Sequence, residues 1–205
     1  MKKNIFVSFL MALLVIPAMT QAAVPDTNPS KDNYKIDTSK SNVKWTGKSV
    51  RGGHFGDINI KEGSFTYNGK TISAGTVVMD MNSISVKDLE DPNRQNRLAN
   101  HLKSDDFFSS EKFPESKLVI TGSKAGKTAG EIEVTGDLTI KGITKPVTFP
   151  ASIKVEGNKA TAQGVATVDR SKYDVKYASK SFFDSIGDKA IDDDFTLNFN
   201  VVANQ

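Results

Sequence analysis

The sequence feature that most constrains the fold is a two-residue alternation of apolar and polar side chains, repeated in short segments. Residues 131–141 and 147–155 show it most clearly, and glycine, asparagine and lysine residues separate such segments. A period of two places successive side chains on opposite faces of a strand, whereas a helix repeats every 3.6 residues. Antiparallel strands with one apolar face therefore fit the chain, and many short strands of this kind predict an all-β barrel or sandwich.

One segment departs from this pattern and is predicted to be the only sizeable helix, over residues 91–103. Asp91 suits the N-cap position and Pro92 the first helical position. Leu98 and Leu102 follow at a spacing of four, which places them on one helical face. The helix would lie in a connection between two strands, where a long segment often closes one end of a barrel.

Two details of the second half bear on the interior of the predicted barrel. Pro150 interrupts an alternating segment and cannot donate to a strand ladder, so it marks an edge, a bulge or a break. Small residues alternate along the next segment, at Ala160, Ala162, Gly164 and Ala166. They are interpreted either as close packing against bulky neighbours or as room for a ligand.

The N-terminal residues have the three parts of a secretory signal peptide. Lys2 and Lys3 precede an apolar run, and small residues at Thr20 and Ala22 suit cleavage, so the predicted signal peptide is 1–22. The apolar run is about 12 residues long, whereas a bilayer-spanning helix needs roughly 20. We therefore expect export to the bacterial periplasm or beyond, with no stable membrane span after cleavage.

The remaining chain divides into a flexible lead-in and one folded domain. Residues 23–33 are polar and contain two prolines, which favours a flexible lead-in, and 34–205 form the predicted barrel. Without Lys2 and Lys3, the 27 basic side chains of the full chain become 25, against 24 acidic ones. This near-neutral balance gives no electrostatic support to a nucleic-acid partner. Both a monomer and a homodimer are compatible with the sequence.

Composition and motifs narrow the catalytic possibilities. The chain has no cysteine and two histidines, His54 and His101, which excludes disulfides, thiolate chemistry and a three-histidine zinc site within one chain. The segment 122–128 resembles a phosphate-binding loop but has one residue too few between its glycines, so a hairpin turn is predicted. The acidic run 192–194 is interpreted as a solvated turn. No catalytic residue set and no metal site are predicted.

Two phenylalanine pairs stand in otherwise polar stretches, Phe107–Phe108 and Phe182–Phe183. Each pair either closes an end of the barrel core or lines the mouth of an apolar cavity. The two histidines have comparable alternatives. His54 lies in a glycine-rich bend and His101 on the predicted helix, and each is either structural or the acid–base group of an enzyme.

Several ordered segments together resemble the YceI-like family, also described as polyisoprenoid-binding, lipocalin-like proteins. They are Tyr34–Asp37 with Val43–Trp45, His54–Gly56 with Gly63, Met79–Ile84, His101–Phe108 with Phe113–Pro114, Val134–Val147, and Asp169–Arg170 with Tyr173, Tyr177, Ser179 and Phe182–Asp184. The resemblance covers nearly the whole chain after the lead-in. It implies a lipocalin-like extended antiparallel β-barrel of about eight strands around a long apolar cavity. It also implies an isoprenoid lipid as bound ligand, such as a quinone or a polyprenyl phosphate, without any other cofactor.

The predicted ligand-binding residues form two groups. Those expected to face the interior, as core or as cavity wall, are Val43, Trp45, Val77, Met79, Ile132, Val134, Leu138, Ile140, Phe149, Ile153, Leu197 and Phe199. Those expected at the mouth, near a head group, are Arg51, His54, Arg170, Tyr177, Lys180, Phe182 and Phe183. Two other functions stay open: an enzyme acting on a lipid-like substrate through His54 or His101, and an envelope stress or adhesion module whose barrel is filled by its own side chains.

Overall fold

The computed structural model describes residues 32–183, 185 and 187–205, and it is built mainly of strands. The strands are β1 (Asp32–Ile36), β2 (Asn42–Ser49), β3 (Gly52–Tyr67), β4 (Ile72–Asp80), β5 (Glu115–Ala125), β6 (Glu131–Ile140), β7 (Ile143–Glu156), β8 (Lys159–Asp169) and β9 (Ile191–Asn204). The helical elements are α1 (Pro92–Lys103) and the short 3-10 helices η1 (Met81–Ser83), η2 (Arg170–Tyr173) and η3 (Gly187–Lys189).

Of the predicted N-terminal segments, the structure describes only the last two residues of the lead-in. The predicted signal peptide, 1–22, lies outside the described residues, as does most of the lead-in. The lead-in was predicted to extend to residue 33, but Asp32 and Asn33 belong to β1, where they pair with Tyr67 and Thr66 of β3. Pairing with β3 makes these two polar residues part of a strand. No local sequence pattern predicts this pairing.

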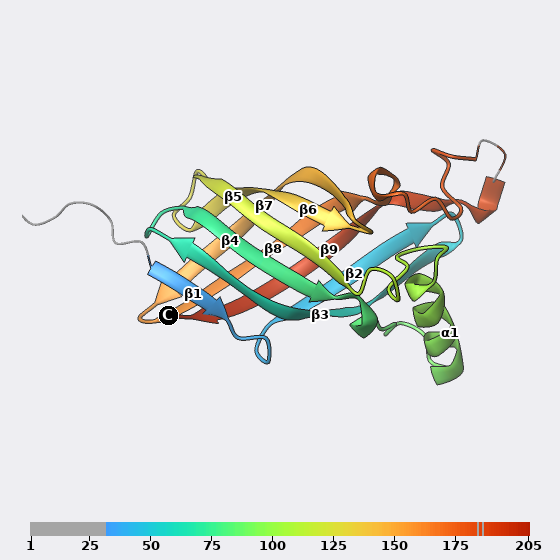
Figure 1. Cartoon of the computed structure of the whole chain (residues 1–205), viewed down its shortest axis with the longest axis horizontal. Coiled ribbons are helices and arrows are strands. Elements are labelled where there is room, and N and C mark those ends of the chain that lie inside the picture. The colour runs from blue at the N-terminus through green and yellow to red at the C-terminus, as the bar shows by residue number, and fades with distance from the viewer. Residues whose placement is uncertain (1–31, 184, 186) are drawn as a thin grey trace, which may run out of the picture.

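The strands form one antiparallel sheet that closes on itself, as Figure 1 shows. Neighbours follow the order β3-β2-β9-β8-β7-β6-β5-β4, and pairing of β4 with β3 completes the ring. β1 pairs with β3 and β9, the same two strands that flank β2. β1 and β2 therefore share one position in the wall, and nine strands form an eight-position barrel. The predicted antiparallel barrel of about eight strands is confirmed.

The helix and the break in strand pairing at Pro150 also agree with the sequence-based predictions. The Asp91 carboxylate accepts a hydrogen bond from the Asn93 amide at 2.9 Å, so it caps α1 as expected. α1 is the one α-helix among the described residues, in the long connection between β4 and β5. Pairing of β7 with β8 begins at Ala151, directly after Pro150, where the ladder would need an amide donor. Within the described ranges, no helix combines the length and apolar character needed to cross a membrane.

The two ends of the barrel differ in construction (Figure 1). One end carries β1 and the C-terminus, and there Tyr34 and Phe65 stack with ring centroids 5.4 Å apart. Tyr34 is 1% exposed, and Ala160 and Ala203 are fully buried beside it in the same apolar core. The other end carries α1 and the irregular segment between β8 and β9. We call the first the closed end and the second the open end.

Candidate functional site: an apolar cavity with a polar mouth

The barrel encloses a cavity of about 1520 Å³. Every position of the wall contributes apolar side chains to it, for instance Val43 from β2, Ile58 from β3 and Phe149 from β7. Apolar residues of the β4–β5 connection cover part of its open end: Met81, Ile84, Leu98, Leu102, Phe107 and Phe108. Pockets for drug-sized molecules are typically about 300–1,000 Å³, so this cavity suits a larger and mainly apolar ligand.

Eleven of the twelve predicted interior residues line this cavity, all except Ile153. Ile153 is buried in the apolar core, where it pairs with Ala162 across β7 and β8, but it does not reach the cavity. Of the two positions expected for it, Ile153 therefore takes the core position. The sequence prediction missed Ile58 and Ile60 of β3, although their alternation with polar residues was visible. It also missed Met81 and Ile84 of the β4–β5 connection, because outside a strand no period marks an inward side chain.

The small residues of β8 provide both space inside the barrel and close packing against bulky neighbours. Ala162 and Ala166 line the cavity, so they leave space inside the wall. Gly164 instead allows close packing, because a Cβ atom there would lie 2.6 Å from the Phe199 ring. Phe199 itself lines the cavity and packs edge-on against Phe149.

Two buried polar side chains of the described chain line the cavity, Ser116 and Arg170. Ser116 is 7% exposed and lies at the start of β5, directly opposite Met79 of β4. Its hydroxyl can donate and accept a hydrogen bond within a wall that is mainly apolar. Sequence reasoning missed Ser116, although it shares its face of β5 with Leu118 and Ile120.

The β2–β3 turn meets the β8–β9 connection at the open end. The Arg51 guanidinium forms an ion pair with Asp188 at 2.6 Å, and the Val50 amide donates to the Ala190 carbonyl at 3.2 Å. The Arg51 ion pair also holds the pKa of Asp188 below its ordinary value. The two loops that hold the predicted mouth residues therefore contact each other beside the cavity.

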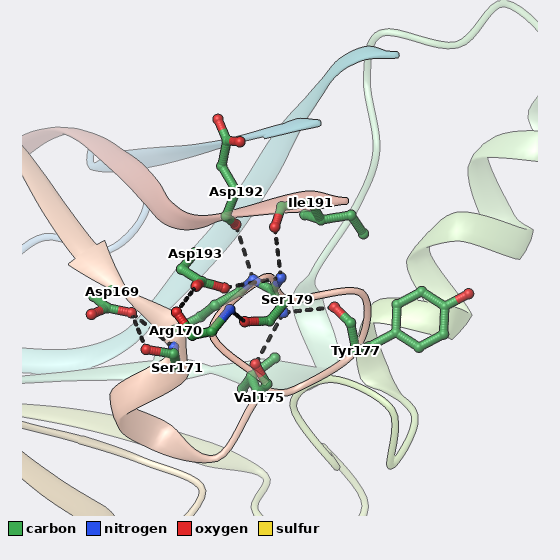
Figure 2. A network of polar contacts seen from close by, with 10 residues as sticks. Asp169, Arg170, Ser171, Val175, Tyr177, Ser179, Ile191, Asp192 and Asp193 are labelled. Atoms are coloured by element: carbon green, nitrogen blue, oxygen red, sulfur yellow. Dashed lines mark hydrogen bonds and ion pairs between the residues drawn. The ribbon is translucent and has the colours of Figure 1, made fainter. Parts of the chain in front are cut away.

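Arg170 fixes the path of the β8–β9 connection, as Figure 2 shows. Its guanidinium donates to four backbone carbonyls, those of Val175, Tyr177, Ile191 and Asp192, at 2.9–3.0 Å. It also pairs with the Asp193 carboxylate at 3.3 Å. The four hydrogen bonds use four of the five N–H donors of the side chain, which is 4% exposed. Arg170 therefore has a structural role in this connection, and the head-group contact predicted for it stays a prediction.

The other predicted mouth residues separate into two orientations. Arg51, His54, Tyr177 and Phe183 line the cavity. Lys180 and Phe182 do not line it and are exposed to solvent, so they lie outside the cavity, and their contact with a ligand head group stays a prediction. The reason is local: the Phe182 amide donates to the Ser179 carbonyl at 3.2 Å, in a turn that directs these two residues outward. Phe182 also lies under the Lys176 ammonium group, 5.4 Å from the ring centroid.

The aromatic pairs also take different positions. Phe107 is buried and Phe108 half-buried, and both line the cavity beneath the open end. The Tyr177 ring packs against Phe107, with centroids 5.1 Å apart, and edge-on against His101 at 4.8 Å. This aromatic contact joins the β8–β9 connection to the β4–β5 connection across the mouth.

Each histidine is bonded to a carboxylate. His54 Nδ1 lies 2.7 Å from Asp88, which also accepts from the Phe55 amide at 3.0 Å. Burial raises the pKa of Asp88, but these hydrogen bonds outweigh it and hold the pKa below its ordinary value. His101 Nε2 lies 2.9 Å from Asp106. The histidines therefore fasten the β4–β5 connection, and the structure brings His54 but not His101 to the cavity wall.

The absence of a side chain at Gly56 allows the β4–β5 connection to approach the barrel closely. A Cβ atom at this position would lie 1.8 Å from the Ser85 carbonyl oxygen, which no side chain could tolerate. The same carbonyl accepts a hydrogen bond from the Trp45 indole at 2.9 Å. Among the described residues, no cluster of three or more His, Asp or Glu side chains is arranged to hold a metal ion.

Comparison with known proteins identifies the family. The family model described as the YceI-like domain matches residues 34–203. A UPF0312 protein of Shewanella denitrificans is 36% identical over 163 residues, covering 77% of this chain and 76% of the relative. Protein YceI of Salmonella arizonae is 33% identical over 164 residues, again covering 77% and 76%.

A solved structure shows the same fold at low sequence identity. A polyisoprenoid binding domain from Saccharophagus degradans, implicated in plant cell wall breakdown, matches with a TM-score of 0.58 and 11% identity. The match covers 83% of this chain and 97% of that one. With a family model that spans the barrel and relatives above 30% identity, the chain belongs to the YceI-like family.

Proposed function

We propose that this protein is an exported, non-enzymatic binding protein that holds the chain of an isoprenoid lipid inside its barrel. The observation that carries the proposal is the cavity itself, about 1520 Å³ of space that extends from the interior of the barrel to its open end and has a mainly apolar lining. Burial of apolar surface contributes roughly 25 cal/mol per Å², so a long apolar chain would gain substantially by entering. A barrel filled by its own side chains would leave no such space.

The family supports an isoprenoid rather than another apolar ligand. The matching domain of Saccharophagus degradans is named as polyisoprenoid binding, and this chain shares its fold. The isoprenoid chain would lie along the cavity, and its head group at the open end beneath Phe107 and Phe108. Ser116, His54 and Arg51 are the polar groups of the wall and rim that would face a quinone or polyprenyl phosphate there.

The contacts of both histidines favour binding over catalysis. His54 and His101 each bond a carboxylate of the β4–β5 connection, Asp88 and Asp106, so the arrangement has a structural purpose. An enzyme acting through His54 is the remaining rival, because that side chain does line the cavity. It predicts turnover of the bound lipid that is lost in His54→Ala while binding persists.

The decisive experiment is native mass spectrometry on protein recovered from the periplasmic fraction, with organic extraction of bound material. We expect a stoichiometric isoprenoid lipid. An empty protein that takes up neither a quinone nor a polyprenyl phosphate in detergent would contradict the proposal and favour the stress or adhesion module. Recovery of the protein only from the cytoplasm would contradict the proposed export.

A pair of adjacent substitutions tests whether the interior holds the lipid. Ala166 lines the cavity, and its neighbour Val165 points outward and is 44% exposed. Ala166→Phe should fill part of the cavity and sharply reduce the amount of bound lipid, whereas Val165→Phe should leave it unchanged. Equal lipid content in both variants would place the ligand outside the barrel.

A further inference from the structure

The large apolar side chains exposed in the described part of the chain fall into two sets. Three valines, Val119, Val155 and Val165, stand singly on strands. The other four gather in loops at the open end: Val50 (57% exposed), Tyr177 (43%), Phe182 (42%) and Phe183 (49%). Among the described residues, the exposed large aromatic side chains are therefore all beside the mouth of the cavity. Clustered exposed apolar side chains mark interaction sites, whereas single ones are ordinary.

Two of these residues make no contribution to the cavity lining. Val50 and Phe182 do not line it, and both lie in turns that project from the end of the barrel. Val50 is in the β2–β3 turn and Phe182 in the β8–β9 connection, which the Arg51–Asp188 ion pair joins. Arg170 fixes the second of these segments from within (Figure 2). The exposed positions are thus held in place by the protein.

Cationic side chains occur in the same two loops as these apolar residues, and the Lys176 ammonium group lies over the Phe182 ring. Residues 48–51 and 176–189 include Lys48, Arg51, Lys176, Lys180 and Lys189, against Asp184 and Asp188. Asp188 is paired with Arg51, and Lys176 with Asp174. Lys180 is exposed and faces away from the cavity. Exposed aromatic rings with nearby lysines are the composition of surfaces that bind the interface of anionic bilayers.

We propose that the open end docks on a bilayer with anionic head groups, with Val50 and Phe182 entering the interface and Lys180 contacting the head groups. The proposal rests on the proposed function, since an isoprenoid lipid resides in a bilayer and must pass from it into the cavity. Docking at the mouth would place the cavity opening against the membrane, so that the lipid need not cross water.

The test compares vesicle binding of purified wild-type protein with that of Val50→Ser/Phe182→Ser and of Lys180→Glu. The vesicles are phosphatidylcholine mixed with phosphatidylglycerol, or phosphatidylcholine alone. We expect flotation of wild type with the mixed vesicles, a loss of about tenfold or more in affinity for the double variant, and a loss of about fivefold for Lys180→Glu. Val165→Ser, on the barrel wall, is the matched control and should bind like wild type.

A second measurement separates docking from ligand binding. Each variant is loaded with a quinone in detergent, which bypasses the membrane, and is then tested for uptake of the same quinone from mixed vesicles. The double variant should load normally in detergent and slowly from vesicles. Failure to load wild type in detergent would contradict the proposed function with this ligand. Normal loading with no vesicle binding by wild type, or equal binding by the double variant, would overturn the docking proposal and favour a protein partner.

Discussion

The closed and open ends of the barrel are held together by different kinds of interaction. At the closed end, stacked and buried apolar side chains such as Tyr34 and Phe65 lie within regular strand pairing. At the open end, irregular segments are held by polar contacts of Arg170, His54 and Arg51. Buried apolar side chains stabilise the whole barrel. In contrast, each of these polar contacts, called a clamp below, holds a single segment in place.

Because of this difference, the two ends should lose their structure independently of each other. Loss of packing at the closed end should lower the free energy of unfolding of the whole domain. Loss of a clamp at the open end should release one segment locally, because such segments contain few of the buried apolar contacts that couple a region to global unfolding.

Tyr34→Ala should lower the free energy of unfolding by about 3–5 kcal/mol, because it removes a ring that is 1% exposed and stacked on Phe65. Tyr34→Phe is the control, since it keeps the ring and loses only the bond between the hydroxyl and Gln205 at 3.2 Å. Urea denaturation measures both variants. At the open end, Phe183→Ala should change the same quantity by less than about 1 kcal/mol. Equal losses at the two positions would remove the proposed contrast.

Arg170→Ala should release the β8–β9 connection, because four carbonyls and the Asp193 carboxylate lose a common partner. Breaking a buried ion pair in this way costs about 3 kcal/mol. Limited proteolysis should then cut within residues 174–190, before the barrel itself unfolds. Arg170→Lys should behave similarly, since an ammonium group cannot reproduce the planar five-donor geometry. A lysine variant as resistant as wild type would mean that charge alone holds the segment.

Ser116→Ala should weaken binding of a quinone by about fivefold, the effect of losing one neutral hydrogen bond of about 1 kcal/mol. Stability should be nearly unchanged, because the smaller side chain only enlarges an existing cavity. Thr121→Ala, on an exposed position of the same strand, is the control for the substitution itself. Fluorescence titration measures the affinity. An unchanged affinity would place the head group nearer to the rim than Ser116.

Asp88→Asn should remove an acid-sensitive clamp at the open end. Because the pKa of Asp88 is depressed in the folded protein, its carboxylate adds stability at pH values above its ordinary value of 3.8. That contribution is lost as the pH falls through the folded-state pKa. We expect a difference of about 1 kcal/mol or less from wild type at neutral pH, vanishing at lower pH. Hydrogen exchange of the Phe55 and Lys87 amides reports it, and a difference that grows on acidification would contradict the assignment.

The sequence predicts the strand-built part of the molecule well, because there the direction of a side chain follows from local alternation. Val134 and Phe149 face inward for the same reason that Thr135 and Thr148 do not. The helix is equally local, since Asp91 and Pro92 mark its start.

The open end is harder to predict, because its contacts depend on the path of the chain. Arg170 was expected to bind a ligand, since no sequence pattern reveals that four carbonyls of a later loop surround it. Lys180 and Phe182 were expected at the cavity for the same reason, and a single turn at Ser179 directs them outward. The role of Ser116 depends on the volume enclosed by the whole barrel, which no local pattern records.

The shared wall position of β1 and β2 determines when the cavity can form. Both strands pair with β9, so Asn42 meets Asn200 and Lys35 meets Asn204 across almost the full length of the chain. Contacts between residues so distant in sequence form slowly, because a long loop must close before they are made. The ring stays open until the last strand arrives, and a partly synthesised chain has no interior to fill. A chain that crosses a membrane unfolded would therefore acquire its ligand space only at its destination.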